Sequence, residues 1–222
     1  MAISKLKPRH ASEGRSIAAV LAERIDYSKN PEKTDGGLLV TGYQCSPETA
    51  WFYFSVSKEI YTATTGRRRA PDKDVISYLI IQSFEPGTIT PEEANKLGYR
   101  LALEFTGGEH QFIVATHIDK KHIHNHIEFN STALDCSHKF NNIKNSYIPL
   151  RKANDLICQE FGLSIIENPE ENRAIFFNVH EAIIDRPTWE RVQKMKKGTR
   201  RKRPTVTQEP SVFSDVLKCP EY

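Results

Sequence analysis

A short histidine-rich segment, HIDKKHIHNHIEFN, most strongly limits what this chain can fold into. It runs from His117 to Asn130 and contains four of the eight histidines of the chain. With the apolar and β-branched residues before it, the segment predicts two strands, 111–119 and 122–130, joined by a tight turn through Lys120 and Lys121. Strands joined so closely run antiparallel, so we expect a hairpin within an antiparallel sheet.

The paired histidines of this hairpin predict a metal site. Side chains at i, i+2 and i+4 of a strand share a face, so His122, His124 and His126 are expected to point the same way. Burying imidazoles without partners is unfavourable, whereas a divalent metal binds the neutral ring and favours convergence. His117, on the preceding strand, can supply a further ligand, and Asp119 can accept a hydrogen bond from a ligand ring. Three histidines with an open coordination position favour catalysis over a structural role.

The remaining patterns alternate between helices and strands. A short strand is expected over 2–6, and VISYLIIQSF predicts another strand. Thr90, Pro91 and Glu93 form the capping-box signature of a helix over 90–105. Three further helices are expected: one from Ile17 to the residues before Pro31, one over 46–61 with Ser46 as N-cap and Pro47 at its first position, and one over 148–162. These elements predict an α/β fold of the α+β sandwich type, with a mainly antiparallel central sheet flanked by helices.

Composition excludes several classes of protein. The 222 residues are 38% hydrophobic and 27% charged, with no long apolar run and no signal peptide at the N-terminus, so we expect a cytoplasmic protein without a membrane segment. The cysteines are too far apart for a zinc knuckle or a disulfide framework; they are Cys45, Cys136, Cys158 and Cys219. No H-E-x-x-H motif occurs, which argues against a zincin protease.

Positive charge is concentrated in two runs, although the net charge is only +3. One run is Arg67, Arg68 and Arg69. The denser run lies near the C-terminus and comprises Lys194, Lys196, Lys197, Arg200, Arg201, Lys202 and Arg203. Such runs suit contacts with phosphates, and a solvated surface or linker explains either run equally well.

The histidine segment resembles the third motif of mobilization relaxases, members of the HUH endonuclease superfamily. The pattern of that motif, His-x-Asp, a short gap, His-x-His and then Asn, matches His117, Asp119, His124, His126 and Asn130. The resemblance implies a HUH-type sheet, metal ligation by His117, His124 and His126, and DNA contact by Asn130. The residue between the paired histidines, usually apolar, is Asn125 in this register. His122-Ile123-His124 is the alternative pair, so His122 stays open as an additional ligand.

Two further segments resemble relaxase motifs. AERIDYSKNPEKT resembles the N-terminal motif that carries the nucleophilic tyrosine, which would be Tyr27. A phenol is almost wholly protonated at neutral pH, so it needs a base or a nearby cation to attack a phosphodiester. Tyr43 is the next candidate. Ser83 resembles the serine of the second motif, which contacts DNA near the nick. Imidazole ligands favour manganese, and the family resemblance allows magnesium.

The C-terminal part has a different character. The sequence NVHEAIIDRPTWERVQKMKKGTRRKRPTVTQEPSVFSDVLKCP resembles the DNA-binding recombinase domain of large serine recombinases, up to the first cysteine of its zinc ribbon, here Cys219. We therefore predict a relaxase nuclease domain over 1–169 and a small, helical, basic fragment over 170–222, truncated before the ribbon. DNA contacts are expected from Lys197, Arg200, Arg201 and Arg203; a remnant without function is the alternative.

These resemblances imply a metal-dependent nickase that cuts one DNA strand at a transfer origin through a tyrosine adduct. Its expected partners are single-stranded origin DNA and accessory relaxosome proteins, in the mobilization or conjugative transfer of a mobile element. Two alternatives stay open. One is a degenerate relaxase that binds origin DNA without cleaving it, and the other is a metal-dependent phosphodiesterase that forms no covalent intermediate.

Overall fold

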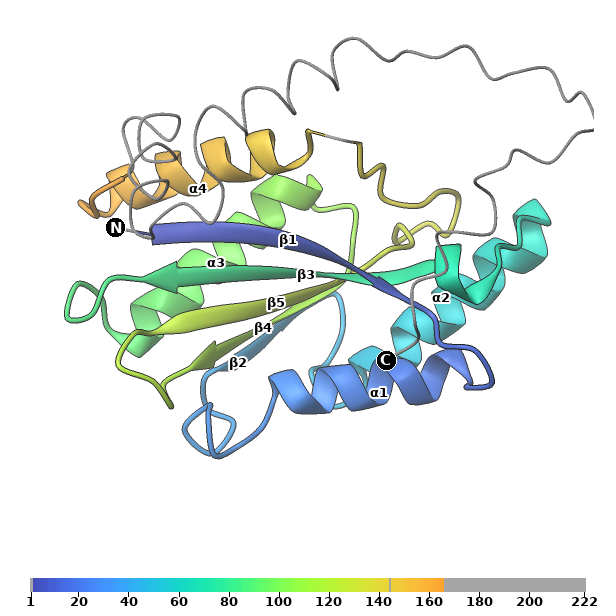
Figure 1. Cartoon of the computed structure of the whole chain (residues 1–222), viewed down its shortest axis with the longest axis horizontal. Helices are drawn as coiled ribbons and strands as arrows, with labels where there is room; N and C mark the ends of the chain where they lie inside the picture. Colours follow the sequence, from blue (N-terminus) through green and yellow to red (C-terminus); the bar gives the residue numbers. More distant parts are fainter. Residues whose placement is uncertain (1, 144, 166–222) are drawn as a thin grey trace, which may run out of the picture. The chain divides into compact units, whose positions relative to one another are not determined.

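A computed structural model describes residues 2–143 and 145–165 of the chain. Its centre is a five-stranded sheet with the order β1-β3-β5-β4-β2, in which every neighbouring pair is antiparallel (Figure 1). The strands are β1 (Ala2–His10), β2 (Val40–Tyr43), β3 (Val75–Phe84), β4 (Phe112–His117) and β5 (His124–Asn130). The predicted domain boundary and the 170–222 fragment lie outside the described residues.

Helices cover both faces of this sheet, as Figure 1 shows. Helices α3 (Pro91–Thr106) and α4 (Tyr147–Glu160) lie on one face, and α1 (Ile17–Ser28) and α2 (Ala50–Thr65) lie on the other. A 3-10 turn, η1 (Pro71–Lys73), precedes β3. The predicted α+β sandwich with an antiparallel sheet is therefore confirmed.

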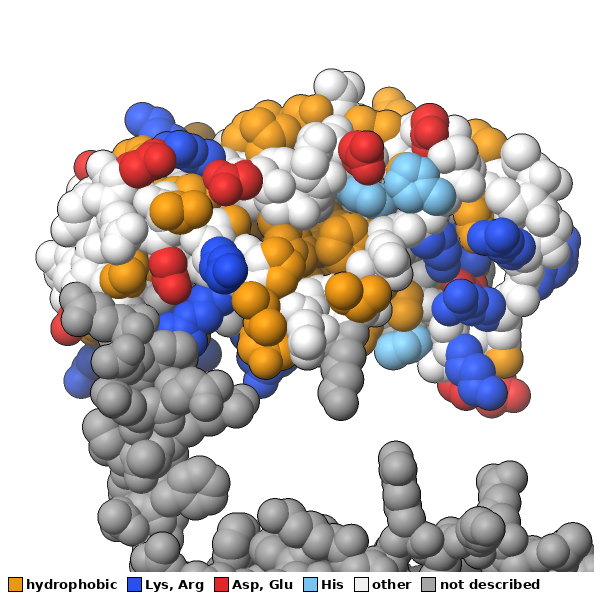
Figure 2. Space-filling model, turned by 90° about the horizontal axis from the view of Figure 1, so that it is seen from above, with side chains coloured by type: hydrophobic (Ala, Val, Ile, Leu, Met, Phe, Trp, Pro, Cys, Tyr) orange, Lys and Arg blue, Asp and Glu red, His pale blue; other side chains and the backbone are white. Residues whose placement is uncertain are grey.

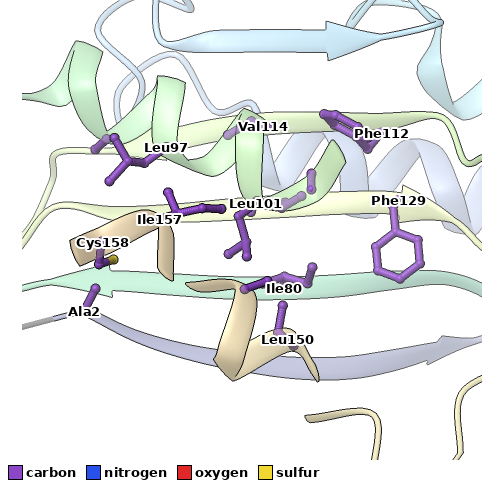
Figure 3. Packing of buried hydrophobic residues seen from close by; sticks show 14 of the residues in the cluster. Ala2, Ile80, Leu97, Leu101, Phe112, Val114, Phe129, Leu150, Ile157 and Cys158 are labelled. Atoms are coloured by element: carbon purple, nitrogen blue, oxygen red, sulfur yellow. The ribbon is translucent and has the colours of Figure 1, made fainter. Parts of the chain in front are cut away.

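The larger hydrophobic core lies between the sheet and the α3/α4 pair (Figure 3). Leu101 from α3, Ile80 from β3 and Phe129 from β5 are fully buried there. A smaller core joins α1 and α2 to the other face, where Val20, Leu21 and Phe54 are buried. Because successive side chains of a strand point to opposite faces, the residues between the apolar positions of β5 are directed toward the α1/α2 side.

The helices begin where local chemistry predicts, with one exception. The Thr90 side chain accepts from the backbone N–H of Glu93, whose carboxylate accepts from that of Thr90, so the predicted capping box is present. The prediction for the second helix was wrong at its start: α2 begins at Ala50, with Thr49 as N-cap. The Ser46 hydroxyl donates to the Glu48 carboxylate and caps no helix.

Three strand predictions also needed correction. The first strand extends to His10 because β1 pairs along almost the whole length of β3. Strand β2 was not predicted; it pairs with β4 at the edge of the sheet. The connection between β4 and β5 spans 118–123 rather than two lysines, so His122 precedes the strand instead of belonging to it. Among the described residues, no helix has the length and apolar character needed to cross a membrane.

Candidate metal centre

The hairpin brings three histidines together at one end of the sheet. His117, the last residue of β4, pairs directly with His124, the first residue of β5. His126 lies two residues further along β5 and therefore shares the face of His124. One nitrogen from each of the three rings lies within 4.8 Å of the other two. Among the described residues, no other group of three histidine, cysteine or acidic side chains comes this close together.

Each ring leaves a nitrogen available to a ligand. His117 Nε2 lies 2.7 Å from the Ser28 carbonyl oxygen, which only accepts, so this nitrogen carries the proton and Nδ1 holds the lone pair. His124 Nδ1 lies 3.4 Å from the His122 carbonyl oxygen. His126 Nδ1 is buried and has no hydrogen-bond partner among the described residues. A buried polar atom without a partner is costly, and a metal ion bound here would remove that cost.

The electrostatic environment keeps these rings neutral. Burial lowers the pKa of His117 and of His124. Burial, with the mutual repulsion of the three rings, lowers the pKa of His126 to about 3. Neutral imidazole is the form that ligates metal, so the site is already in the required protonation state near neutral pH.

Tyr27 lies beside this cluster, in the last turn of α1. Its side chain is 57% exposed, and its ring centroid is 6.3 Å from that of His126. The hydrogen bond between His117 and Ser28 ties the helix end that carries Tyr27 to one of the three histidines. Tyr43, the alternative candidate, lies elsewhere: its ring stacks on Phe112 and its hydroxyl donates to the Gly108 carbonyl.

Of the other residues predicted at the site, Ser83 lies beside the histidines, whereas Asp119 and His122 lie in the loop between β4 and β5. Ser83 pairs with His124 across β3 and β5, so its side chain lies on the same face, about 5 Å away at the Cβ atoms. Asp119 lies exposed in the loop after β4, and the protonated nitrogen of His117 contacts the Ser28 carbonyl rather than this carboxylate. His122 is in the same loop, with its ring centroid 5.2 Å from that of His124, and it is not part of the three-histidine cluster.

The opposite face of β5 explains why a polar residue stands between the paired histidines. Asn125 is fully buried under α3. Its amide donates to Gln82 Oε1 and to the Ala94 carbonyl, at 2.8 and 2.6 Å, and accepts from Thr116 Oγ1 at 2.7 Å. Helix α3 can approach this closely because residue 98 is glycine; a Cβ there would lie 2.5 Å from Asn125 Nδ2. The polar residue is therefore accommodated by a complete set of hydrogen bonds.

Glu128 is a further buried group on the histidine face that sequence reasoning missed. It follows His124 and His126 at the same spacing of two, and this periodicity was the available signal. Burial raises its pKa to about 7, opposed by Arg9, whose Nε lies 3.6 Å from Glu128 Oε1, and by a hydrogen bond from Ser77. A carboxylate and a guanidinium thus continue the polar row beyond the histidines.

Four residues predicted to contact DNA, Asn130 and the three arginines Arg67, Arg68 and Arg69, lie toward the other end of the sheet. Asn130 ends β5, six residues or about 20 Å from His124. It is 1% exposed; its amide donates to Ser57 Oγ and accepts from the Thr132 N–H, so its position is structural and the predicted DNA contact does not fit it. Arg67, Arg68 and Arg69 lie between α2 and β3, and Figure 2 shows Lys and Arg side chains at both ends of the face that it draws. The tail residues Lys197, Arg200, Arg201 and Arg203 lie outside the described residues.

A family model and the similar curated proteins all indicate the same family, the relaxases. The family described as "Relaxase: MobA/VirD2-like, nuclease domain" matches residues 27–163. Protein rlx of Staphylococcus aureus is 39% identical over 137 residues, which cover 62% of this chain and 38% of that protein. The group II intron-interrupted relaxase LtrB of Lactococcus lactis subsp. cremoris is 32% identical over 186 residues, covering 68% and 32%. The chain thus spans less than half the length of the curated relatives it matches.

A solved structure described as "Molecular Basis of Vancomycin Resistance Transfer in Staphylococcus aureus" is also similar. It has 14% sequence identity and a TM-score of 0.47, and the match covers 74% of this chain and 96% of that chain.

Proposed function

Because the chain belongs to the MobA/VirD2-like relaxase nuclease family, we propose that it nicks one strand of DNA at a transfer origin, for the mobilization or conjugative transfer of a mobile element. We propose that Tyr27 is the nucleophile. One observation carries this proposal: the exposed Tyr27 side chain stands beside three convergent neutral histidines, on a helix end that is hydrogen-bonded to one of them.

The residues that would hold a divalent metal are His117, His124 and His126. Their neutral rings and the unpartnered His126 Nδ1 fit this role. An ion bound there, manganese by the preference of imidazole or magnesium with oxygens from substrate and water, would withdraw charge from the scissile phosphate. The hydrogen bond from His117 to Ser28 fixes which nitrogen of that ring is free.

In the proposed step, the Tyr27 oxygen forms a bond to phosphorus as the bond between phosphorus and the 3′ oxygen breaks. The phenol loses one proton and the departing 3′ oxygen gains one, so the products are a 5′-phosphotyrosyl adduct and a free 3′ hydroxyl. The pairing of Ser83 with His124 supports a contact between the Ser83 hydroxyl and the same DNA strand near the nick. A cleft of about 330 Å³ beside the end of α1, lined in part by Asp26, Lys29 and Pro31, is large enough to receive a small ligand and could hold an adjoining nucleotide.

A covalent-capture experiment tests this proposal. The full chain is incubated with Mn²⁺ and a labelled pool of single-stranded oligonucleotides, and adducts are resolved on a denaturing gel and located by mass spectrometry. Tyr27→Phe should abolish the adduct while single-strand affinity stays nearly unchanged, since phosphate contacts dominate that affinity. Tyr43→Phe is the matched control and should retain the adduct.

The other outcomes separate the alternatives. An adduct that persists in Tyr27→Phe contradicts the assignment of the nucleophile. Cleavage without an adduct indicates a phosphodiesterase, and binding of DNA without cleavage indicates a degenerate relaxase. The wider contacts remain proposals: phosphate binding by Arg67, Arg68 and Arg69, an accessory role for the 170–222 fragment, and accessory relaxosome proteins.

A further inference from the structure

Lys33 has an unusual position next to the proposed nucleophile. Its Nζ lies over the face of the Tyr27 ring, 4.5 Å from the ring centroid, within the range of a cation–π contact. The residue is only partly exposed, yet no carboxylate of the described residues pairs with it. An ammonium held over the nucleophile without a carboxylate partner among the described residues is available to bind an anion that enters the site.

The loop that carries Lys33 is held firmly at both ends. The Lys33 N–H donates to the Asn30 carbonyl at 2.9 Å, and the Lys33 carbonyl accepts from the Ile118 N–H, also at 2.9 Å. The next residue, Thr34, is fully buried, and its hydroxyl donates to the Asn30 carbonyl. Ile118 directly follows His117, so these bonds fix the Lys33 backbone against the strand that supplies a metal-site histidine.

Lys33 therefore places a positive charge beside the neutral histidines, where a divalent ion would bind. The bond from the Ile118 N–H to the Lys33 carbonyl, and the 6.3 Å between the Tyr27 and His126 ring centroids, place this ammonium near the histidines. A divalent ion among the histidines would be repelled by it. Such an arrangement is favourable only when an anion lies between the ion, the ammonium and the tyrosine.

We propose that Lys33 is a catalytic residue that contacts the scissile phosphate, its ammonium binding a non-bridging phosphate oxygen while its side chain lies over Tyr27. This role rests on the proposed function. Lys33 neither gains nor loses a proton: the Tyr27 oxygen bonds to phosphorus, the 3′ oxygen departs with the electron pair, and the ammonium balances the negative charge that gathers on the phosphate oxygens. Charge stabilisation by a fixed donor is strongest in a site that is partly shielded from water.

The test uses three variants of the full chain. Lys33→Met removes the charge at similar length, Lys33→Arg keeps the charge, and Lys121→Met is the matched control, removing an exposed lysine from the neighbouring loop. The rate of adduct formation is measured at saturating oligonucleotide with Mn²⁺. Oligonucleotide affinity and Mn²⁺ affinity are measured separately, the second by calorimetry without DNA.

We expect Lys33→Met to slow adduct formation at least about a hundredfold, as losing one charge-stabilising donor does in other sites. Lys33→Arg should recover most of the rate, and Lys121→Met should match the wild type. Mn²⁺ affinity should be unchanged or tighter in Lys33→Met, since a repelling charge is removed, whereas a merely structural role would weaken it.

The failure of this inference can be distinguished from the failure of the proposed function. If the wild type forms an adduct and Lys33→Met forms it equally fast, the inference is wrong and the function stands. A slow Lys33→Met variant that has also lost Mn²⁺ affinity overturns the inference as well, because Lys33 would then support the fold of the site. If the wild type forms no adduct with any oligonucleotide, the proposed function itself fails.

Discussion

Strand β5 presents polar side chains to both faces of the sheet, but within the described part of the chain only those on one face have hydrogen-bond partners for all their buried atoms. Toward α3 and α4, Asn125 has partners for both ends of its amide. The network continues from Gln82, whose Nε2 donates to Asn154 Oδ1 on α4 at 2.9 Å. Toward α1 and α2, His126 Nδ1 and Glu128 Oε1 are buried without a hydrogen-bond partner among the described residues.

This difference separates stability from function. A buried polar network that is fully hydrogen-bonded rigidifies the fold and contributes to its stability. Polar atoms that are buried without partners cost stability, and a protein tolerates that cost where a ligand completes the set. The α3/α4 face therefore holds the sheet together, and the α1/α2 face carries the unpartnered atoms for which we propose a metal ion as the partner.

The largest effect expected from this comparison is the loss of metal binding in His126→Ala. Removing one of three protein ligands should weaken Mn²⁺ binding at least about a hundredfold and abolish adduct formation, because too few ligands remain to hold an open-site ion. The unfolding free energy of the metal-free protein should change little, since the lost ring includes an atom without a partner. Calorimetric titration and urea denaturation measure the two quantities.

A second buried histidine provides the control for this variant. His110 is 2% exposed, and its Nδ1 lies 3.1 Å from the Thr132 carbonyl, outside the three-histidine cluster. His110→Ala should lower stability and leave Mn²⁺ affinity unchanged.

If His122→Ala removed metal binding and His126→Ala did not, the ligand set would be His117, His122 and His124.

The next largest effect is on the other face, in Asn125→Ala. This change removes the buried acceptor of the Thr116 hydroxyl and the buried donor to Gln82 Oε1 and the Ala94 carbonyl, so the free energy of unfolding should fall by about 2–4 kcal/mol. The exposed Asn142→Ala is the control and should cost less than about 0.5 kcal/mol. Urea denaturation in the presence of a chelator measures both variants. A tenfold loss of Mn²⁺ affinity in folded Asn125→Ala would show that the two faces are not independent.

Much of the fold could be predicted because its signals are local. The capping box of α3 involves residues three apart, and β3 is recognisable from a continuous run of β-branched and aromatic residues. The approach of His117 to the β5 histidines was also predictable, because a hairpin pairs its strands in a fixed register and alternation sets the face; the choice of His126 over His122 came from the family resemblance. These predictions needed no knowledge of distant contacts.

The features that sequence reasoning missed depend on contacts between distant residues. Strand β2 has four residues, and only its pairing with β4 makes it a strand. The bond between Ser28 and His117 joins residues 89 apart, so the approach of Tyr27 to the histidines rested on family resemblance alone. The periodicity of β5 indicates the face of Glu128, but its contact with Arg9 of β1 joins residues far apart in the sequence.

The most conditional effect concerns Glu128, because it appears only as pH changes, and it tests how the histidine face carries charge. Burial raises the pKa of Glu128 from its reference value of 4.5 to about 7, so folding favours the neutral form of this carboxyl. Below about pH 4.5 the group is neutral in both states and costs nothing; above about pH 7 it is charged in both, and the folded state bears the full cost. The stability of the wild type relative to Glu128→Gln should therefore fall as pH rises between these values, by roughly 3 kcal/mol in all. Urea denaturation of both metal-free proteins across that range gives the difference, in which the titration of the neighbouring histidines largely cancels. A difference that stays constant with pH would mean that Arg9 holds Glu128 ionised as a complete ion pair. The charge of Glu128 would then be neutralised without a ligand. The contrast between the two faces of β5 would rest on His126 alone.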